Sequence, residues 1–577
     1  MGQQRRARNP VLCRVFTPPM ASNTTRATHR LVITALAVCF GCASNPRIRT
    51  TGSPSVPPRA VVAIPASNWG TKKQAVHVLN RLAFGPSPED LANIQRLGVE
   101  TWINQQLHPM QIPDELVADK LRAFPTLDKS IAELEEEYAP PEERARMLGL
   151  TPGSLEAKRA IETIPREELP QQIQVELVGA KLVRATQSQR QLQEVLVDFW
   201  FNHFNVSADK GLVRWMATSY ERDAIRPFIF GYFRTLLGAT AHHPAMLFYL
   251  DNWLSVREVD PTRKNPITPG PGLNENYARE LLELHTVGVN GGYTQKDVPE
   301  TARCFTGWSI DQPNRKATFL FKERAHDPGA KQLMGLSVAP GGGASDGEKV
   351  LDYLAMHPST ARLIASKLCR KFVSDDPPVQ LVNRVSKVFV ETGGYLPAVY
   401  ASIFSSPEFW SEQAFEAKTK TPFEFAISAI RALGGLTNGD FQLHQQLDRL
   451  GEPLYRAQAP TGYLDRSDAW VNAGALVNRI NFGLALASNR IHGTTTDVRG
   501  YAWRHVGRND LSDVAESLAA LILHHPLTAS ARKTIYRALG EQEEERHADG
   551  ASRPIDAPML RACCWAHPTF RRGDNAI

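Results

Sequence analysis

The chain has 577 residues, of which 42% are hydrophobic and 22% charged, which is typical of a folded globular protein and not of a disordered or fibrous one. The net charge of +6 lies in residues 1–42, which hold six arginines and no acidic residue, so that the rest of the chain balances 60 basic against 60 acidic residues. The rest of the chain therefore gives no charge argument for a nucleic-acid partner or for binding to an anionic membrane surface.

Residues 1–42 have the pattern of an export signal. A basic region around Arg26 and Arg30 precedes the apolar run "LVITALAVCFGCAS", which is shorter than the roughly 20 residues that span a bilayer. The run ends in "GCAS", which resembles a lipoprotein cleavage site, so we expect lipidation of Cys42. A signal that is cleaved without lipidation is the alternative, and either Met1 or Met20 is its start.

The rest of the chain predicts a mainly α protein. Residues 43–68 are rich in Ser, Pro and Thr and predict a flexible tether. Helical spacing of apolar residues over 69–577 predicts one large multihelical domain, with a charged, proline-broken insertion at about 120–170. Within 311–345 the runs "ATFLFKE" and "QLMGLSV" predict the strands of a small β-hairpin insert.

The cysteines give no metal or redox motif. No C-x-x-C pair is present, and Cys304 and Cys369 are the only cysteines between the leader and the adjacent pair Cys563-Cys564. Export permits a disulfide between Cys304 and Cys369, but two buried free thiols are the favoured interpretation. The H-E-x-x-H and Walker motifs are absent too, so the sequence implies no metal and no identified cofactor.

A helix predicted over 192–206, "LQEVLVDFWFNHFNV", is apolar around most of its circumference and should be buried. It carries one polar stripe, which consists of Glu194, Asp198, Asn202 and Asn205. Polar groups on a buried helix must face water, another polar helix or an internal cavity. His203 lies away from the stripe, on the apolar arc.

The segment "NENYARELLELHTVG", residues 274–288, predicts a second helix of the same kind. Asn276, Arg279 and Glu280 share its polar face, whereas His285 falls in the middle of the apolar arc. A histidine in such a place is more often a satisfied core residue than a reactive one. The competing hypothesis is that His203 and His285 point from two packed helices toward one partly polar interior, where Asp198, Asn202, Glu280 or the pair His326-Asp327 supply hydrogen-bond partners.

These residues make a candidate site within 194–331. The candidate catalytic residues are His203, Glu280 and His285. The candidate binding residues are Asp198, Asn202, Asn276, Arg279, His326 and Asp327.

A family resemblance covers most of the chain. The segments "DFWFNHFNVSADKG", "GATAHHPAMLFYLDN", "GLNENYARELLELHTVGVNGGYTQKDV", "HDPGAKQLMG" and "WVNAGALVNRINFGLAL" resemble successive motifs of the domain of unknown function family 1800. The resemblance implies a helix-rich, exported bacterial protein and no particular reaction. Members tend to be encoded beside exported sulfatase-like proteins, which implies such a protein as a partner.

Two classes of function agree with these features. We expect a binding or assembly component of the cell envelope, located in the periplasm or held at the outer membrane by a lipid anchor. The alternative is a hydrolase of an envelope polymer that uses the histidine and carboxylate groups of 194–331. An enzyme needs those groups to converge in an open cleft, whereas a binding protein needs them only to be satisfied.

Overall fold

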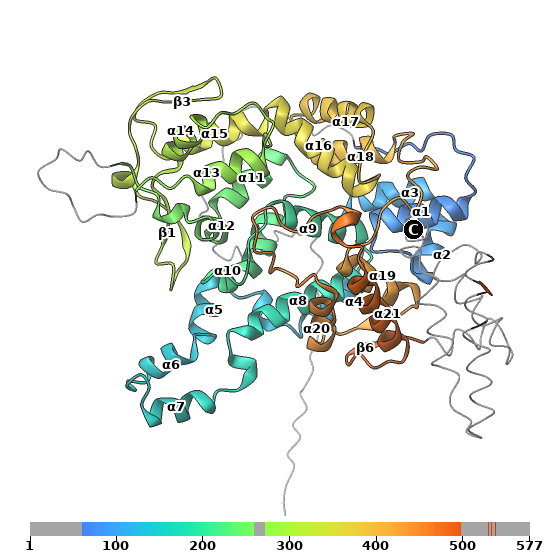
Figure 1. Cartoon of the computed structure of the whole chain (residues 1–577), viewed down its shortest axis with the longest axis horizontal. Coiled ribbons are helices and arrows are strands. Elements are labelled where there is room, and N and C mark those ends of the chain that lie inside the picture. The colour runs from blue at the N-terminus through green and yellow to red at the C-terminus, as the bar shows by residue number, and fades with distance from the viewer. Residues whose placement is uncertain (1–59, 259–271, 498–528, 530–531, 534–536, 538–577) are drawn as a thin grey trace, which may run out of the picture. The chain divides into compact units, whose positions relative to one another are not determined.

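The computed structural model describes residues 60–258 and 272–497, together with positions 529, 532–533 and 537 (Figure 1). The first helices are α1 (Thr71–Leu82), α2 (Pro88–Leu97), α3 (Val99–Gln106), α4 (Glu115–Leu121), α5 (Ile131–Glu137), α6 (Pro141–Met147) and α7 (Leu155–Glu162). The next are α8 (Gln171–Gln187), α9 (Gln191–His203), α10 (Val213–Ser219), α11 (Phe233–His242), α12 (Pro244–Tyr249), α13 (Asn276–Glu280) and α14 (Asp297–Phe305). The last are α15 (Ser345–Ala355), α16 (Pro358–Phe372), α17 (Val379–Glu391), α18 (Leu396–Phe404), α19 (Pro422–Ala432), α20 (Phe441–Leu450) and α21 (Ala473–Ala487).

The described residues confirm the predicted mainly α fold. The strands form three two-stranded antiparallel sheets, which consist of β1 (Trp308–Asp311) with β2 (Thr318–Phe321), β3 (Lys331–Leu333) with β4 (Leu336–Val338), and β5 (Leu436–Thr437) with β6 (Thr494–Thr495). None of these sheets is large enough to organise a core by itself. The core is therefore made by helix packing.

Helix α9 lies at the centre of that packing. Its apolar residues Leu192, Leu196 and Trp200 are completely buried, as its all-round apolar pattern predicts. It contacts α1, α3, α8 and the segment 220–225. Its polar stripe is thereby carried into the interior of the protein.

The β insert differs from the single predicted hairpin. The run "ATFLFKE" pairs with the preceding strand, Trp308 opposite Phe321, so β1–β2 is one hairpin. The run "QLMGLSV" folds back on itself to form β3–β4. Met334 and Gly335 form its two-residue turn with φ of 48° and 87°, the positive values that a tight hairpin turn of this kind requires.

Two helices contain a wider turn that the sequence does not predict. The expected regular helix over 274–288 is α13 followed by a π-helix, Leu281–His285, and a second π-helix spans Tyr220–Ile225 after α10. The Thr286 hydroxyl donates to the Leu281 carbonyl at 2.5 Å, which helps to hold the wider turn. Such turns are frequent at functional sites.

The N-terminal predictions are covered only in part. The export signal, Cys42 and most of the predicted tether lie outside the described residues. The end of the tether is ordered, because Val62 is buried and exchanges two backbone hydrogen bonds of 2.8 and 2.9 Å with the Asn104 side chain. Alternating apolar residues at this end allow the chain to pack as an extended strand.

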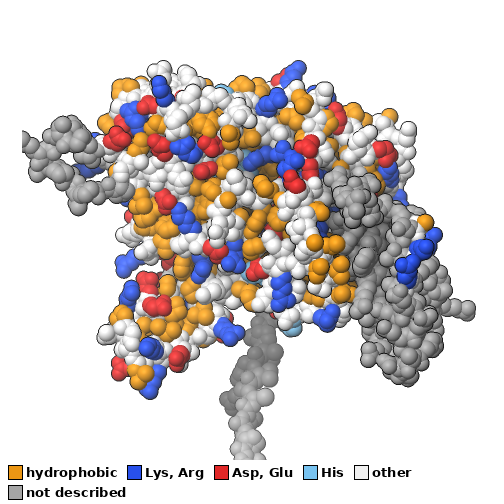
Figure 2. Space-filling view, viewed as in Figure 1, with side chains coloured by type: hydrophobic (Ala, Val, Ile, Leu, Met, Phe, Trp, Pro, Cys, Tyr) orange, Lys and Arg blue, Asp and Glu red, His pale blue; other side chains and the backbone are white. Residues whose placement is uncertain are grey.

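The predicted insertion at about 120–170 forms short helices, of which α6 packs on α7 and α5 packs on α10. Cys304 and Cys369 are buried free thiols, as expected. Within the described ranges, no helix combines the length and the apolarity needed to cross a membrane. Acidic and basic side chains are interspersed over the face shown in Figure 2, which agrees with the balanced charge of the chain after its leader.

Candidate functional site

The polar stripe of α9 faces a pocket between α9 and the segment 452–465, which connects α20 to the residues before α21. Asp198, Asn202 and Asn205 all line this polar pocket. It encloses about 600 Å³ of empty space when its open mouth is included, and the centres of water-sized molecules can reach about 50 Å³ of it. A cavity, one of the three surroundings expected from the sequence, therefore accounts for Asp198, Asn202 and Asn205, whereas Glu194 of the stripe pairs with Arg226 at 2.6 Å.

Two amides of the stripe hold the segment 452–465 in place. Asn202 exchanges two hydrogen bonds with the backbone of Tyr463, at 2.7 and 2.8 Å. Asn205 donates to the carbonyls of Ala457 and Ala459, both at 2.9 Å. Asn202, a predicted binding residue, thus has its amide engaged by the protein backbone. The two amides make the far wall of the pocket a fixed part of the fold.

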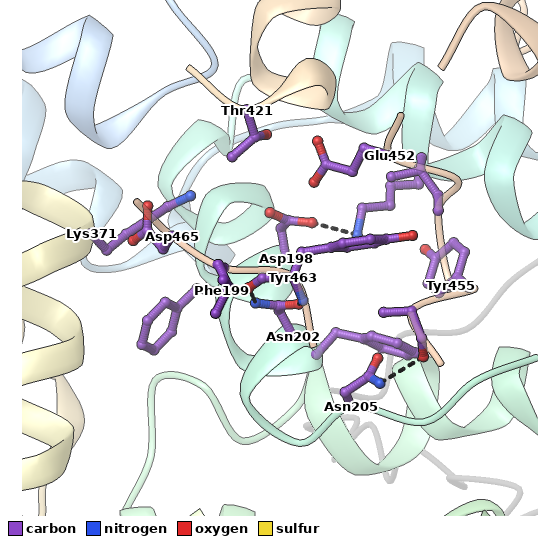
Figure 3. A pocket seen from close by; sticks show the side chains of 15 residues that line it. Asp198, Phe199, Asn202, Asn205, Lys371, Thr421, Glu452, Tyr455, Tyr463 and Asp465 are labelled. Atoms are coloured by element: carbon purple, nitrogen blue, oxygen red, sulfur yellow. Dashed lines mark hydrogen bonds and ion pairs between the residues drawn. The ribbon is translucent and has the colours of Figure 1, made fainter. Parts of the chain in front are cut away.

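Carboxyl groups from two distant parts of the chain meet in the pocket. Asp198 is paired with Lys181 of α8 at 2.6 Å, and Glu452 lies close by, where Thr421 also contacts it (Figure 3). Glu452 accepts a hydrogen bond of 2.8 Å from the Phe423 amide. Burial, followed by the nearby charge of Asp198, raises the pKa of Glu452 to about 8. Glu452 is therefore a neutral acid at pH 7.

A second group of charges lies on the α16 side of the pocket. Lys371 pairs with Glu424 at 2.6 Å, and Lys418 pairs with Asp465 at 2.8 Å. Burial alone would lower the pKa of Lys371, but the carboxylates of Glu424, Asp465 and Asp198 together outweigh it and raise that pKa. One oxygen of Asp465, Oδ2, is buried and has no hydrogen-bond partner. The lining therefore has near-balanced charge and one acceptor that the protein leaves free.

This lining can bind hydrogen-bonding groups more readily than it can bind a metal. Carboxyl, amide and ammonium groups alternate in it with the aromatic side chains of Phe199, Tyr455 and Tyr463. Across the described part of the chain, no group of three or more His, Cys, Asp or Glu side chains is placed to hold a metal ion.

The two predicted histidines meet beside this pocket but do not line it. The rings of His203 and His285 are 6.2 Å apart, so the predicted convergence is correct. His203 Nε2 donates to the His285 carbonyl at 3.1 Å, and His203 Nδ1 accepts from the Lys367 ammonium at 3.0 Å. Both imidazoles are buried, and Phe199 stacks on His203 on the pocket side.

The partners expected for these histidines are not the ones found. Neither Asp198, Asn202 nor the pair His326-Asp327 contacts them, and Lys367 of α16 takes that place. Burial, followed by Lys367, lowers the pKa of His285 to about 3. The His285 Nε2 atom has no hydrogen-bond partner. The cluster is cationic and enclosed, without the carboxylate that would orient a catalytic histidine.

The remaining residues of the 274–288 segment lie elsewhere. Arg279 pairs with Glu275 at 3.1 Å and more loosely with Glu283 at 3.9 Å. Asn276 donates to the Leu250 carbonyl at 3.3 Å. Glu280 is half-buried, and burial followed by the charge of Glu283 raises its pKa. These contacts are those of a polar helix face, and Glu280 makes no hydrogen bond to His285 Nε2, which has no partner.

His326 and Asp327 belong to a separate buried cluster near the hairpins. His326 Nε2 lies 3.3 Å from Asp346, which also pairs with Lys331 at 2.6 Å. Asp327 accepts from Arg303 at 2.8 Å. The structure therefore divides the candidate site into four places: the polar pocket, the histidine pair, the polar face of the 274–288 segment, and this hairpin cluster.

Several pocket residues were missed from the sequence. Glu452 and Asp465 lie in a segment without periodicity, more than two hundred residues after α9, and no local pattern distinguishes them. Lys367 and Lys371 do leave a signal, because both fall beside the buried arc of α16, which includes Ile364. Two lysines next to an apolar arc at a spacing of four indicate buried acidic or imidazole partners.

One comparison with known proteins gives a match. A family model with the description "Protein of unknown function (DUF1800)" matches residues 77–572. No curated protein and no solved structure matches the chain.

Proposed function

This chain belongs to the DUF1800 family of proteins of unknown function, and we propose that it is a binding component of the cell envelope that holds a hydroxyl-rich ligand in its polar pocket. The envelope location rests on the leader, with its basic region, its short apolar run and Cys42 in a lipoprotein-like context. The resemblance adds an exported sulfatase-like protein as the proposed partner.

One observation supports a hydroxyl-rich ligand. Hydrogen-bond donors and hydrogen-bond acceptors converge in a pocket whose charges are already paired. Asp198 and the free Asp465 Oδ2 are acceptors, whereas neutral Glu452 can donate. A hydroxyl group donates and accepts at once, so several hydroxyls on one ring match this lining. Because Lys181 and Lys418 already neutralise the two aspartates, a neutral ligand is favoured over an ion.

The aromatic side chains support the same ligand class. Phe199, Tyr455 and Tyr463 line the pocket together with the polar groups. Pockets of this type bury the apolar faces of a ligand against rings and orient it with a few polar contacts. A sugar unit of an envelope polymer has both kinds of surface.

The alternative is hydrolysis of such a polymer, and one observation favours it. Glycoside hydrolysis needs one protonated and one ionised carboxyl group on either side of the bond that breaks. Glu452, with a pKa of about 8, and Asp198, paired with Lys181, meet the protonation requirement. The hydrolase hypothesis therefore depends on these carboxyl groups and no longer on His203 and His285.

The test is a calorimetric titration of the full chain with soluble peptidoglycan fragments and with neutral oligosaccharides. Mass spectrometry of the same mixtures then detects any cleaved products. A binding component binds one of these probes and leaves it intact. A hydrolase cleaves it, and Glu452→Gln abolishes cleavage but keeps binding. Glu156→Gln, at an exposed position of α7, is the matched control. If none of the probes binds or is cleaved, the pocket is only a hydrated part of the core.

The location and the partner need separate experiments. Cell fractionation tests the envelope location. A pull-down from envelope fractions with mass spectrometry tests the partner, and recovery of no sulfatase-like protein would remove that part of the proposal.

A further inference from the structure

A second cavity is bounded by α4, α8, α10 and the π-helix Tyr220–Ile225. It encloses about 760 Å³ with its mouth included, and the centres of water-sized molecules reach about 270 Å³ of it. That reachable volume is far larger than the 50 Å³ of the polar pocket. At roughly 10–15 Å³ per water molecule it is also more than a few trapped waters would occupy.

Arginine dominates the lining of this cavity. Four arginines, namely Arg122, Arg184, Arg222 and Arg226, line it together with two carboxylates, Asp128 and Glu221. Asp128 is exposed, so Glu221 is the carboxylate of the interior.

Glu221 is already engaged by other groups. One of its oxygens accepts from Arg226 at 3.0 Å, and the other accepts from the Tyr455 hydroxyl at 2.6 Å. Arg226 in turn forms a two-pronged pair with Glu194, at 2.6 and 3.0 Å. These contacts fix Glu221 and Arg226 to each other and to their neighbours.

Arg184 has only a loose ion pair with Glu221. Its side chain is 20% exposed, and its nearest carboxylate oxygen, on Glu221, is 3.8 Å away. No hydrogen bond to its guanidinium is present among the described residues. A guanidinium has five N–H donors, and one that is mostly buried normally engages an acceptor with several of them.

Thr218 adds an unsatisfied buried hydroxyl to the same lining. Its side-chain oxygen is buried and has no hydrogen-bond partner, and the residue is 2% exposed. Unpaired buried hydroxyls are uncommon because they lose the hydrogen bonds that water would provide. An acceptor placed in the cavity would lie against the lining that contains both Arg184 and Thr218.

We infer that this cavity is a binding site for a small oxyanion, a carboxylate, phosphate or sulfate group, which Arg184 and Thr218 hold. Oxyanions present several acceptor atoms in the geometry that guanidinium groups bind best. The site does not depend on the proposed function of the polar pocket, with which it shares no lining residue.

The experiment is calorimetric titration of the full chain with inorganic phosphate, sulfate and acetate in turn, so that the three sources of an oxyanion are separated. Saturable binding of at least one anion is expected. Arg184→Gln should weaken it roughly tenfold or more, the effect of losing a charge-assisted hydrogen bond. Thr218→Val, which keeps the shape of the side chain, should weaken it by a smaller factor.

Arg324→Gln is the control, because it removes a positive charge of the same type at an exposed position outside the cavity. It should leave the affinity unchanged. The inference is overturned if no anion binds saturably, or if Arg324→Gln weakens binding as much as Arg184→Gln does. If Arg184→Gln fails to fold, unchanged affinity in Thr218→Val overturns the assignment of that hydroxyl to the site.

Discussion

Glu452 offers a direct test of the electrostatics of the polar pocket. It is 6% exposed, and its pKa is raised from 4.5 to about 8, first by burial and then by Asp198. Glu452→Gln keeps the size and the acceptor for the Phe423 amide, but it cannot ionise. The substitution therefore isolates the free energy of unfolding that the protein loses by keeping this carboxyl group protonated in the pocket.

The direction of the effect follows from proton binding. Between pH 4.5 and 8 the folded protein keeps a proton on Glu452 that the unfolded chain has lost, so wild-type stability falls as pH rises through this range. At pH 7, about 2.5 pH units above the ordinary pKa of 4.5 and still below the folded-state pKa, the lost stability amounts to about 3 kcal/mol. We expect Glu452→Gln to be more stable than wild type by about this amount at pH 7, and nearly equal to it at pH 4.5.

Urea unfolding followed by far-UV circular dichroism at pH 5, 6, 7 and 8 measures this difference. Asp198→Asn, which removes the second cause, should reduce the pH dependence of wild type without abolishing it. The exposed Glu156→Gln serves as the control and should show no gain that grows with pH. A Glu452→Gln protein that is less stable than wild type at pH 7, or whose gain is the same at pH 5 and pH 8, would refute the reasoning.

Three further predictions concern other parts of the chain. Cys42→Ala should move the protein from the membrane fraction to the soluble periplasmic fraction, and a wild-type protein found only in the soluble fraction contradicts lipidation. His285 has a pKa of about 3 against an ordinary 6.5, so the folded state binds fewer protons than the unfolded state in this range and loses stability as pH falls. At pH 5, His285→Phe should remove about 2 kcal/mol of this loss of unfolding free energy, which urea unfolding at pH 5 and 7 measures. If the variant loses as much stability between pH 7 and pH 5 as wild type does, His285 is not a buried neutral imidazole. Gly462 has φ of +67°, and a Cβ there would lie 2.3 Å from Asn202 Oδ1. Gly462→Ala should therefore destabilise the protein by more than about 1 kcal/mol and make segment 452–465 sensitive to limited proteolysis. A variant that resists the protease as well as wild type does would contradict the close approach.

Periodicity was sufficient to predict the helices and the burial of α9. Its stripe of Asp198, Asn202 and Asn205 indicated a polar interior because isolated polar groups are not buried without partners. The identity of those partners was not predictable, since a stripe on one helix contains no information about which distant segment packs on it. Glu452 and Asp465 come from such a segment.

For the histidine pair, too, the sequence predicted burial correctly but not the contacting residues. Placing His203 and His285 on apolar arcs predicted that both would be buried, and their rings are 6.2 Å apart. The predicted hydrogen-bond partners were wrong because they were chosen for being near the histidines in the sequence, whereas the partner found, Lys367, comes from a distant helix. The π-helix Leu281–His285 was also missed, since a single wider turn changes the helical repeat too little to be seen in the spacing of leucines.

The four amide hydrogen bonds that tie segment 452–465 to α9 have a consequence for rates. Water-sized molecules reach only about 50 Å³ of the polar pocket, so we expect a ligand as large as a sugar unit to fit fully only when Asn202 and Asn205 release the backbone. At roughly 0.5–1.5 kcal/mol for each net hydrogen bond, the released state is populated to about one part in thirty or less. Association is then limited by this opening and not by diffusion, and escape must pass through the same rare state. Escape is then slowed about thirtyfold or more compared with an open pocket that makes the same contacts, and a ligand enclosed before cell lysis can be sought by unfolding the protein and identifying what it releases.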